Sequence, residues 1–258
     1  MKNAIKYYFL YIVIVLLATP VIVYSLSFLV GKYVLRNEVS YESIMNSSAL
    51  DNVTMIIGNL LLIACFIKGG YTNLSFSKSW FKDKTLFSWA IALELSSILP
   101  INLLVASLDF NDYAMATSGG TLSVASVVGI CLLAPLAEEM AMRGGVEERL
   151  LQWKNNPMVA ILLSSFLFAI LHLYPSLIIG AFLGGIIYGW LYYRTRNIWI
   201  CFLMHFANNS LSCLMDWLYS NNSISPDILF QTNVIVLALF SLAFMVVSIM
   251  NIKRKTEI

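Results

Sequence analysis

Residues 7–30 read YYFLYIVIVLLATPVIVYSLSFLV, a stretch without a charged side chain. A helix needs about 20 consecutive apolar residues to cross the hydrocarbon core of a bilayer. The stretch follows Lys2 and Lys6, as the apolar region of a signal peptide follows its basic residues, but that region is only about 7–15 residues long. We therefore expect residues 7–30 to form an uncleaved membrane-spanning helix.

Similar apolar stretches recur along the rest of the chain. Of its 258 residues, 59% are hydrophobic and 12% are charged, whereas a soluble domain has about 45–50% apolar and about 25% charged residues. These proportions predict an all-α polytopic membrane protein with a single transmembrane domain over residues 1–258. The net charge of +2 is too small to indicate a nucleic-acid partner, and we expect none. Eight spans are predicted, at 7–30, 53–69, 86–107, 121–142, 157–173, 176–193, 197–219 and 230–251.

The lysines and arginines near the span ends predict the orientation, because cytoplasmic loops carry an excess of them. With eight spans and both termini in the cytoplasm, only Lys32 and Arg36 fall outside. The cytoplasmic side collects Lys2, Lys6, Lys68, Lys78, Lys82, Lys84, Arg143, Arg149, Lys154, Arg194, Arg196, Lys253, Arg254 and Lys255. Loops rich in Lys, Asn and Ile favour a bacterial plasma membrane. We expect a multi-pass cell-membrane protein in contact with the lipid bilayer.

Charged side chains at membrane depth are costly, so they usually face the interior of a bundle and mark a functional site. Residues 138–143 read EEMAMR near the cytoplasmic end of one predicted span. On a helix, Glu139 and Arg143 have the i,i+4 spacing at which a carboxylate and a guanidinium pair. Glu138 lies about 100° further around the helix, without that partner, and is a candidate general base. The alternative is a charged cap at the membrane interface, formed by Glu138, Glu139, Glu147, Glu148 and Arg149.

The chain has two histidines, and both fall inside predicted spans. His172 follows Phe168 by four residues, so the aromatic ring can pack beneath the imidazole and hold its rotamer. His205 and Asn209 share a helix face, with Asn208 beside them. An imidazole and an amide at this spacing can bind a metal or donate hydrogen bonds to an oxyanion. The alternative is that these side chains are core residues, packed or hydrogen-bonded between helices.

Other intramembrane residues have plainer interpretations. The four cysteines lie in apolar stretches, so we expect small buried side chains rather than disulfides or a metal site. The stretch 176–193 carries glycines at a spacing that lets a neighbouring helix approach closely. Glu94 is a further intramembrane carboxylate and a candidate of second rank.

Three motifs follow one another on successive predicted spans: E-E-x-x-x-R at 138–143, F-x-x-x-H at 168–172 and H-x-x-x-N at 205–209. The residues around the last two read FAILHL from 168 and HFANN from 205. In this order the motifs resemble those of the CPBP family of intramembrane proteases, the CAAX prenyl endopeptidase-like and bacteriocin-processing group formerly called Abi. The resemblance covers about residues 121–219, the expected catalytic core, while the other spans match only in being hydrophobic.

The resemblance implies an eight-helix intramembrane endopeptidase and assigns roles to residues of the three motifs. Glu138 and His172 would activate a water for attack on a peptide carbonyl. His205 and Asn209 would stabilise the oxyanion. The residues expected to support this site are Glu139, Arg143 and Phe168.

The cofactor requirement of such a site is open. One mechanism for the family places Zn²⁺ on Glu138, His172, His205 and Asn209, and another needs no metal. Asn is an unusual zinc ligand, so we expect no tightly held zinc.

The three motifs must bring Glu138, His172 and His205 to the same depth in the membrane, and straight helices do not do this. On straight helices, Glu138, His205 and His172 would lie about 8, 13 and 22 Å from the cytoplasmic ends of their spans. Two alternatives would bring His172 to the depth of the others. Either the span 157–173 begins above the membrane, or residues 173–176 form a turn inside the bundle.

We therefore expect an endopeptidase that cuts hydrophobic or membrane-associated peptides. Its expected role is processing of peptide pheromones or bacteriocins, or self-immunity to them. The alternative is a non-catalytic membrane immunity or regulatory protein that binds a partner through its helices. A third hypothesis, a small proton-coupled transporter, predicts a symmetry between two halves that the sequence does not show.

Overall fold

The computed structural model describes residues 1–34, 40–74, 84–108, 110, 123–154, 156–172, 174–221, 223 and 231–256. Within these ranges every regular element is a helix, and seven helices are long and apolar enough to cross a membrane. They are Lys2–Val34, Ser48–Lys68 (α4), Lys84–Ser107 (α6), Val124–Trp153, Pro175–Thr195 (α12), Ile198–Ser220 (α13) and Thr232–Lys255 (α14). The predicted all-α polytopic fold is confirmed, with one fewer full-length span than expected.

Two of the long helices contain π-helical turns. The first joins α1 (Lys2–Tyr11), η1 (Ile12–Ala18), α2 (Thr19–Leu29) and η2 (Val30–Val34), and the short α3 (Tyr41–Met45) follows. The helix that we call span four joins α8 (Val124–Val127), η3 (Val128–Leu133), α9 (Ala134–Glu139), η4 (Met140–Glu147) and α10 (Glu148–Lys154). π-Helical turns are rare and occur frequently at functional sites. In span four, η4 begins directly after Glu139, inside the motif at 138–143.

The predicted span 157–173 is wrong in length. α11 (Pro157–Ala169) begins where the Asn156 side chain accepts a hydrogen bond from the Val159 N–H. It ends after 13 residues, about 20 Å, which is too short for a hydrocarbon core of about 30 Å. Because α12 begins at Pro175, the chain turns at residues 170–174, of which Leu173 lies outside the described residues. The helix thus ends three residues before the predicted turn at 173–176, of which Pro175 and Ser176 belong to α12, and the position of this turn relative to the membrane stays a prediction.

α11 and α12 pack closely against each other because of small side chains. A Cβ atom at Gly185 would lie 3.1 Å from Ser165 Cβ, and one at Gly189 would lie 2.8 Å from Glu147 Oε2. Larger residues at these two positions would push α12 away from its neighbours. Gly180, by contrast, has open space around its Cβ position. The predicted packing role is confirmed at Gly185 and Gly189 but not at Gly180.

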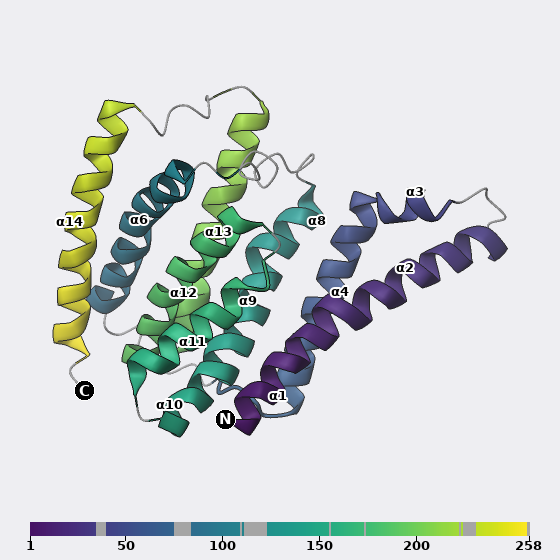
Figure 1. Cartoon of the computed structure of the whole chain (residues 1–258), viewed down its shortest axis with the longest axis horizontal. Helices are drawn as coiled ribbons and strands as arrows, with labels where there is room; N and C mark the ends of the chain where they lie inside the picture. The colour runs from purple at the N-terminus through teal and green to yellow at the C-terminus, as the bar shows by residue number, and fades with distance from the viewer. Residues whose placement is uncertain are drawn as a thin grey trace.

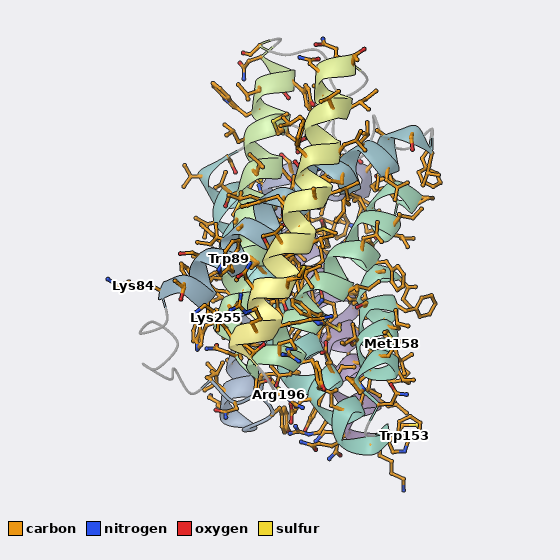
Figure 2. All side chains as sticks on the ribbon, turned by 90° about the vertical axis from the view of Figure 1, so that its left-hand side faces the viewer. Lys84, Trp89, Trp153, Met158, Arg196 and Lys255 are labelled. Atoms are coloured by element: carbon orange, nitrogen blue, oxygen red, sulfur yellow. The ribbon has the colours of Figure 1, made fainter. Side chains whose placement is uncertain are left out.

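Both termini lie at the same, lower end of the bundle in Figure 1, the N-terminus beside α10 and the C-terminus below α14. Arg194 Nη2 donates to the Lys253 carbonyl oxygen at 2.9 Å, which joins the end of α12 to the end of α14. Arg196 forms an ion pair with Glu148 at 2.7 Å, in the lower part of the view in Figure 2. Termini at one end agree with the predicted topology, and the side that faces the cytoplasm stays a prediction. The predicted positive residues outside the described ranges are Arg36, Lys78 and Lys82.

Span four lies at the centre of the bundle. α1 and α11 pack on η4, α4 packs on α9, and α13 packs on both η3 and α9. Every residue of η4, from Met140 to Glu147, is buried. α14 instead packs chiefly on α6, with large apolar side chains such as Phe240 exposed, as expected of a helix that faces lipid. The charged residues of η4 are therefore enclosed by protein.

Candidate active site

Glu139, the last residue of α9, is completely buried and is bound at one carboxylate oxygen by two partners. Arg143 Nη1 donates to Oε1 at 3.1 Å, and His205 Nδ1 lies 2.9 Å from the same atom. Arg143 Nη2 also donates to the Gly185 carbonyl oxygen at 3.0 Å. Additional hydrogen bonds of this kind offset part of the cost of burying an ion pair, although Glu139 Oε2 and Arg143 Nε have no partner among the described residues. The predicted Glu139–Arg143 pair is confirmed, and it joins span four to α12 and α13.

The imidazole of His205 lies between two adjacent carboxylates. Its Nδ1 faces Glu139, and its Nε2 lies 3.7 Å from Glu138 Oε2. Glu138 Oε1 accepts a hydrogen bond from the Tyr11 hydroxyl at 3.3 Å. The Glu138 side chain keeps 15% of its surface exposed, whereas that of Glu139 keeps none. Of the two carboxylates, Glu138 is therefore the one that water can reach.

Aromatic rings frame both histidines. The Phe168 ring meets the His172 ring edge-on at 5.1 Å and the His205 ring edge-on at 5.8 Å. The Tyr188 ring stacks on His205 at 5.2 Å, and the Arg143 guanidinium lies over the rings of both Phe168 and Tyr188. The predicted packing of Phe168 against His172 is confirmed. The same ring also contacts His205, which the sequence did not indicate.

His172 lies in the turn after α11, and it is half-buried. Its Nδ1 lies 3.3 Å from the Phe168 carbonyl oxygen. Because a carbonyl oxygen only accepts, Nδ1 carries the proton in this hydrogen bond and Nε2 is left as an acceptor.

Two findings reduce the expected difference in depth between Glu138 and His172. α11 ends at Ala169, which holds His172 about 20 Å from Pro157. Span four extends to Trp153, so Glu138 lies about 22 Å from this end of the helix and not about 8 Å.

Asn209 lies beside the π-helical turn η3. Its amide nitrogen donates to the Ile130 carbonyl oxygen at 2.9 Å, and Asn208 Nδ2 lies 3.4 Å from Asn209 Oδ1. One of the two amide N–H groups of Asn209 is thus used to join α13 to span four. The second N–H group has no partner among the described residues, so it can donate to a bound group.

Three residues at this site were missed or ranked low by the sequence analysis. Tyr11 and Tyr188 carry no local signal, because aromatic side chains are frequent in membrane helices. Tyr188 donates its hydroxyl hydrogen bond to Glu94 Oε1 at 3.0 Å. Glu94 itself was recognisable as an intramembrane carboxylate, and it is 2% exposed.

The charged-cap interpretation is wrong for two of its five residues, Glu139 and Glu147, which lie in the interior beside Arg143. Glu139, Arg143 and Glu147 are completely buried, and Ser164 donates a hydrogen bond to Glu147 Oε2 at 3.0 Å. Only near Glu148, which pairs with the exposed Arg196, does the segment form a partly exposed charged end.

The expected zinc ligands do not converge on one point. Among the described residues, no group of three or more His, Cys, Asp and Glu side chains has the arrangement of a metal site. Both nitrogens of His205 face carboxylates, and Asn209 is bound to Ile130. As they lie here, Glu138, His172, His205 and Asn209 do not fit zinc, and the chemistry proposed for the site uses their side chains alone. The four cysteines are free, and three of them are buried.

The fold and this centre define a class of protein: a helical membrane protein with a Glu/His/Arg centre enclosed between its spans. Residues 120–211 match the family model described as type II CAAX prenyl endopeptidase Rce1-like. The matched segment contains all three motifs, so the resemblance to the CPBP, or CAAX protease, family is confirmed over these residues. Comparisons with curated proteins and with solved structures found no match. At the level of the family, the match supports an intramembrane CAAX-type protease.

Proposed function

We propose that the chain is an endopeptidase that hydrolyses hydrophobic or membrane-associated peptides with Glu138 as general base. The observation that carries this proposal is the pair of unequal carboxylates on either side of His205. Glu139 is enclosed and bound, so it can hold the imidazole in place. Glu138 is partly exposed, so it can accept a proton from a water molecule.

Each residue of the site has a role in this reaction. Glu138 takes a proton from water while the acceptor Nε2 of His172 orients it, and the water oxygen bonds to the carbonyl carbon of the peptide. His205 acts in this step as an imidazolium, with its Nδ1–H on Glu139 and its Nε2–H donated to the oxyanion, to which the second N–H of Asn209 also donates. The C–N bond then breaks, and the proton held by Glu138 passes to the leaving nitrogen. Arg143 holds the Glu139 carboxylate in place by the bond at 3.1 Å.

The position of the site supports apolar substrates. Glu138 lies in the middle of span four, among helices that are long enough to cross a membrane. A peptide must therefore enter the thickness of the bilayer to reach it. We propose that peptide pheromones or bacteriocin-like peptides of a bacterial plasma membrane are processed here, or neutralised as self-immunity.

The test compares membrane and secreted peptides from cells that carry the wild type, Glu138→Ala, Glu138→Gln or His172→Ala at matched abundance. Glu42→Gln is the matched control, because Glu42 is exposed on the distant α3. We expect one peptide product to disappear in all three site variants and to persist in the control.

The rival hypothesis, a non-catalytic immunity or regulatory protein, makes the opposite prediction. Glu138→Gln retains the shape and the hydrogen-bonding partners of the side chain, so partner binding or immunity would persist. Unchanged peptide profiles together with a retained phenotype would refute the catalytic proposal.

A further inference from the structure

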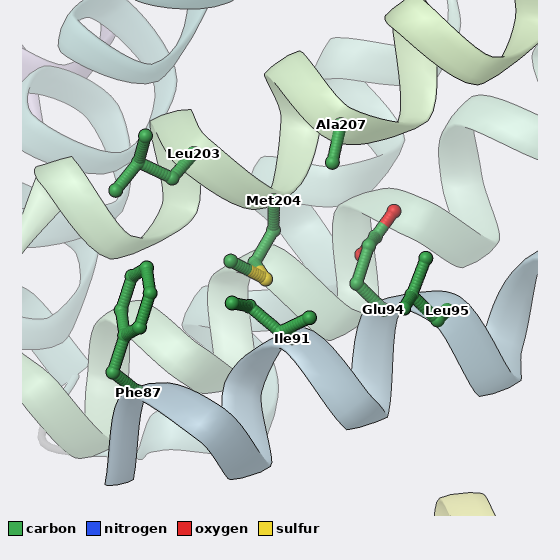
Figure 3. A pocket seen from close by; sticks show the side chains of 7 residues that line it. All are labelled: Phe87, Ile91, Glu94, Leu95, Leu203, Met204 and Ala207. Atoms are coloured by element: carbon green, nitrogen blue, oxygen red, sulfur yellow. The ribbon is translucent and has the colours of Figure 1, made fainter. Parts of the chain in front are cut away.

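Glu94 is a buried carboxylate of α6 that the proposed reaction does not use. A hollow of about 190 Å³ between α6 and α13 borders it, and six apolar side chains make up the rest of the lining (Figure 3). They are Phe87, Ile91, Leu95, Leu203, Met204 and Ala207. The surface that the hollow exposes is apolar, and Glu94 itself is enclosed. Glu94 can therefore act on the candidate active site only through a residue that it contacts.

The residue that Glu94 contacts toward the site is Tyr188 of α12. The Tyr188 hydroxyl donates to Glu94 Oε1 at 3.0 Å, whereas Oε2 has no partner among the described residues. Side chains on a helix lean over the residues three and four positions earlier, and for Tyr188 these are Gly185 and Gly184. Glycines have no side chain that could support the ring from its own helix. The hydrogen bond to Glu94 therefore anchors the hydroxyl end of the ring.

The ring of Tyr188 lies against the face of the His205 imidazole. The two rings stack with their centroids 5.2 Å apart and their planes at 24°. The hydrogen bond between His205 Nδ1 and Glu139 fixes one point of the imidazole, but the ring plane can still tilt about that point. Stacking on Tyr188 fixes the plane, and with it the direction of Nε2, which donates to the oxyanion in the proposed reaction.

We propose that Glu94 and Tyr188 are positioning residues that hold the His205 imidazole in the plane that the reaction needs. Glu94 acts as the acceptor for the Tyr188 hydroxyl, and Tyr188 acts through the face of its ring. The three residues lie on α6, α12 and α13, so the contact also fixes these helices relative to one another. This inference rests on the proposed function, because it explains how a group of that reaction is kept in place.

The first experiment measures kcat and KM of the full chain in liposomes, with a hydrophobic synthetic peptide that the wild type cleaves and Glu138→Gln does not. Tyr188→Phe keeps the ring and removes the hydroxyl, and Glu94→Leu removes the acceptor. We expect each to lower kcat about fivefold, as for the loss of one hydrogen bond, with KM changed less than twofold. The double variant should be no slower than either single one, because all three lack the same bond.

Glu94→Gln is the conservative variant, because its amide oxygen still accepts from Tyr188, and its kcat should lie within twofold of the wild type. Tyr188→Leu also removes the stacked ring and should lower kcat about tenfold below that of Tyr188→Phe. Ser96→Ala is the matched control on α6. Ser96 is buried too, but its hydroxyl donates to the Leu93 carbonyl oxygen of its own helix, so its removal should leave kcat unchanged.

The second experiment observes His205 directly and needs no cleavage. The chain has two histidines, so NMR spectra of the full chain with isotope-labelled histidine are simple, and His172→Gln assigns the signals. The ring current of Tyr188 shifts the stacked His205 ring protons upfield. We expect this shift to disappear in Tyr188→Leu, to diminish equally in Tyr188→Phe and Glu94→Leu, and to persist in Glu94→Gln and Ser96→Ala.

The two experiments separate this inference from the proposed function. If the wild type cleaves the peptide, variants that change only the rate, only the His205 signals or neither would refute the positioning role alone. A loss in Glu94→Gln as large as that in Glu94→Leu would also overturn it, because the charge and not the hydrogen bond would then matter. If no peptide is cleaved in a Glu138-dependent way but the His205 signals follow the expected pattern, the peptidase proposal is refuted and the hold of Glu94 and Tyr188 on His205 stands.

Discussion

Span four and α14 are both long apolar helices, yet one is the centre of the molecule and the other is its edge. In the most apolar part of α14, the buried share of residues is 17%. In the corresponding part of span four it is 44%. The charges of α14 lie in its last turn, whereas span four carries Glu138, Glu139, Arg143 and Glu147 along its length. Hydropathy identifies both as spans. The position of the charges tells which one is enclosed by protein.

The largest expected effect comes from the buried ion pair of span four. Arg143→Ala removes the cation that faces Glu139 and the donor to Gly185. Breaking one half of a buried pair leaves an uncompensated charge, and we expect a loss of about 3–5 kcal/mol of stability. Thermal unfolding of the purified protein in detergent measures this loss.

The matched control for Arg143→Ala is Ser248→Ala in α14. Ser248 is also completely buried, but within the described part of the chain its hydroxyl bonds only to the Phe244 carbonyl oxygen of its own helix. We expect a loss below about 1 kcal/mol from this variant, because the helix keeps its backbone hydrogen bonds. Similar unfolding temperatures for the two variants would show that span four and α14 tolerate the loss of a buried polar side chain equally well.

The next largest loss of stability is expected from a larger side chain at a glycine of α12 that packs closely against its neighbours. Gly185→Leu places a side chain against Ser165, and overpacking of this kind costs about 1–3 kcal/mol. Gly180→Leu lies on the same helix with open space around its Cβ, so we expect a change within about 0.5 kcal/mol. The two unfolding temperatures are compared directly. A loss at Gly180 as large as that at Gly185 would contradict the packing seen between α11 and α12.

A smaller effect is expected where α1 reaches the active site. Tyr11→Phe removes the hydrogen bond to Glu138 and should lower the rate of peptide cleavage about two- to tenfold, as expected for one hydrogen bond. Tyr8→Phe, on the same helix, is the control and should leave the rate unchanged. The initial rates of cleavage of the two variants are compared at a saturating concentration of peptide. If both variants cleave at the wild-type rate, the contact between Tyr11 and Glu138 has no part in catalysis.

The sequence could predict the local features of this centre. The spans follow from runs of about 20 apolar residues, and the Glu139–Arg143 pair follows from the i,i+4 geometry of one helix. The contact between Phe168 and His172 is local in the same way. Each of these predictions needs only the residues of one element.

Contacts between distant elements could not be predicted. Tyr11 and Glu138 are 127 residues apart, and Glu139 meets His205 across 66 residues. The end of α11 was also hidden, because the apolar stretch continues through Ile170 and Leu171 without a residue that stops a helix before Pro175. The π-helical turns of span four have no recognisable signal either, although they shape the segment that carries Glu138 and Glu139.

The smallest expected effect is the removal of metal ions, which tests whether the centre of span four needs anything besides its own side chains. The expected ligands do not converge among the described residues, so we expect peptide cleavage to change less than twofold after dialysis against a strong chelator. Zinc measured by elemental analysis should stay well below one ion per chain. Glu138→Ala, treated in the same way, controls for any contaminating metalloprotease. Loss of cleavage that Zn²⁺ alone restores in the wild type, but not in this variant, would show that Glu138 and its neighbours rearrange around a metal, and the roles derived above for His172 and His205 would then have to be assigned again.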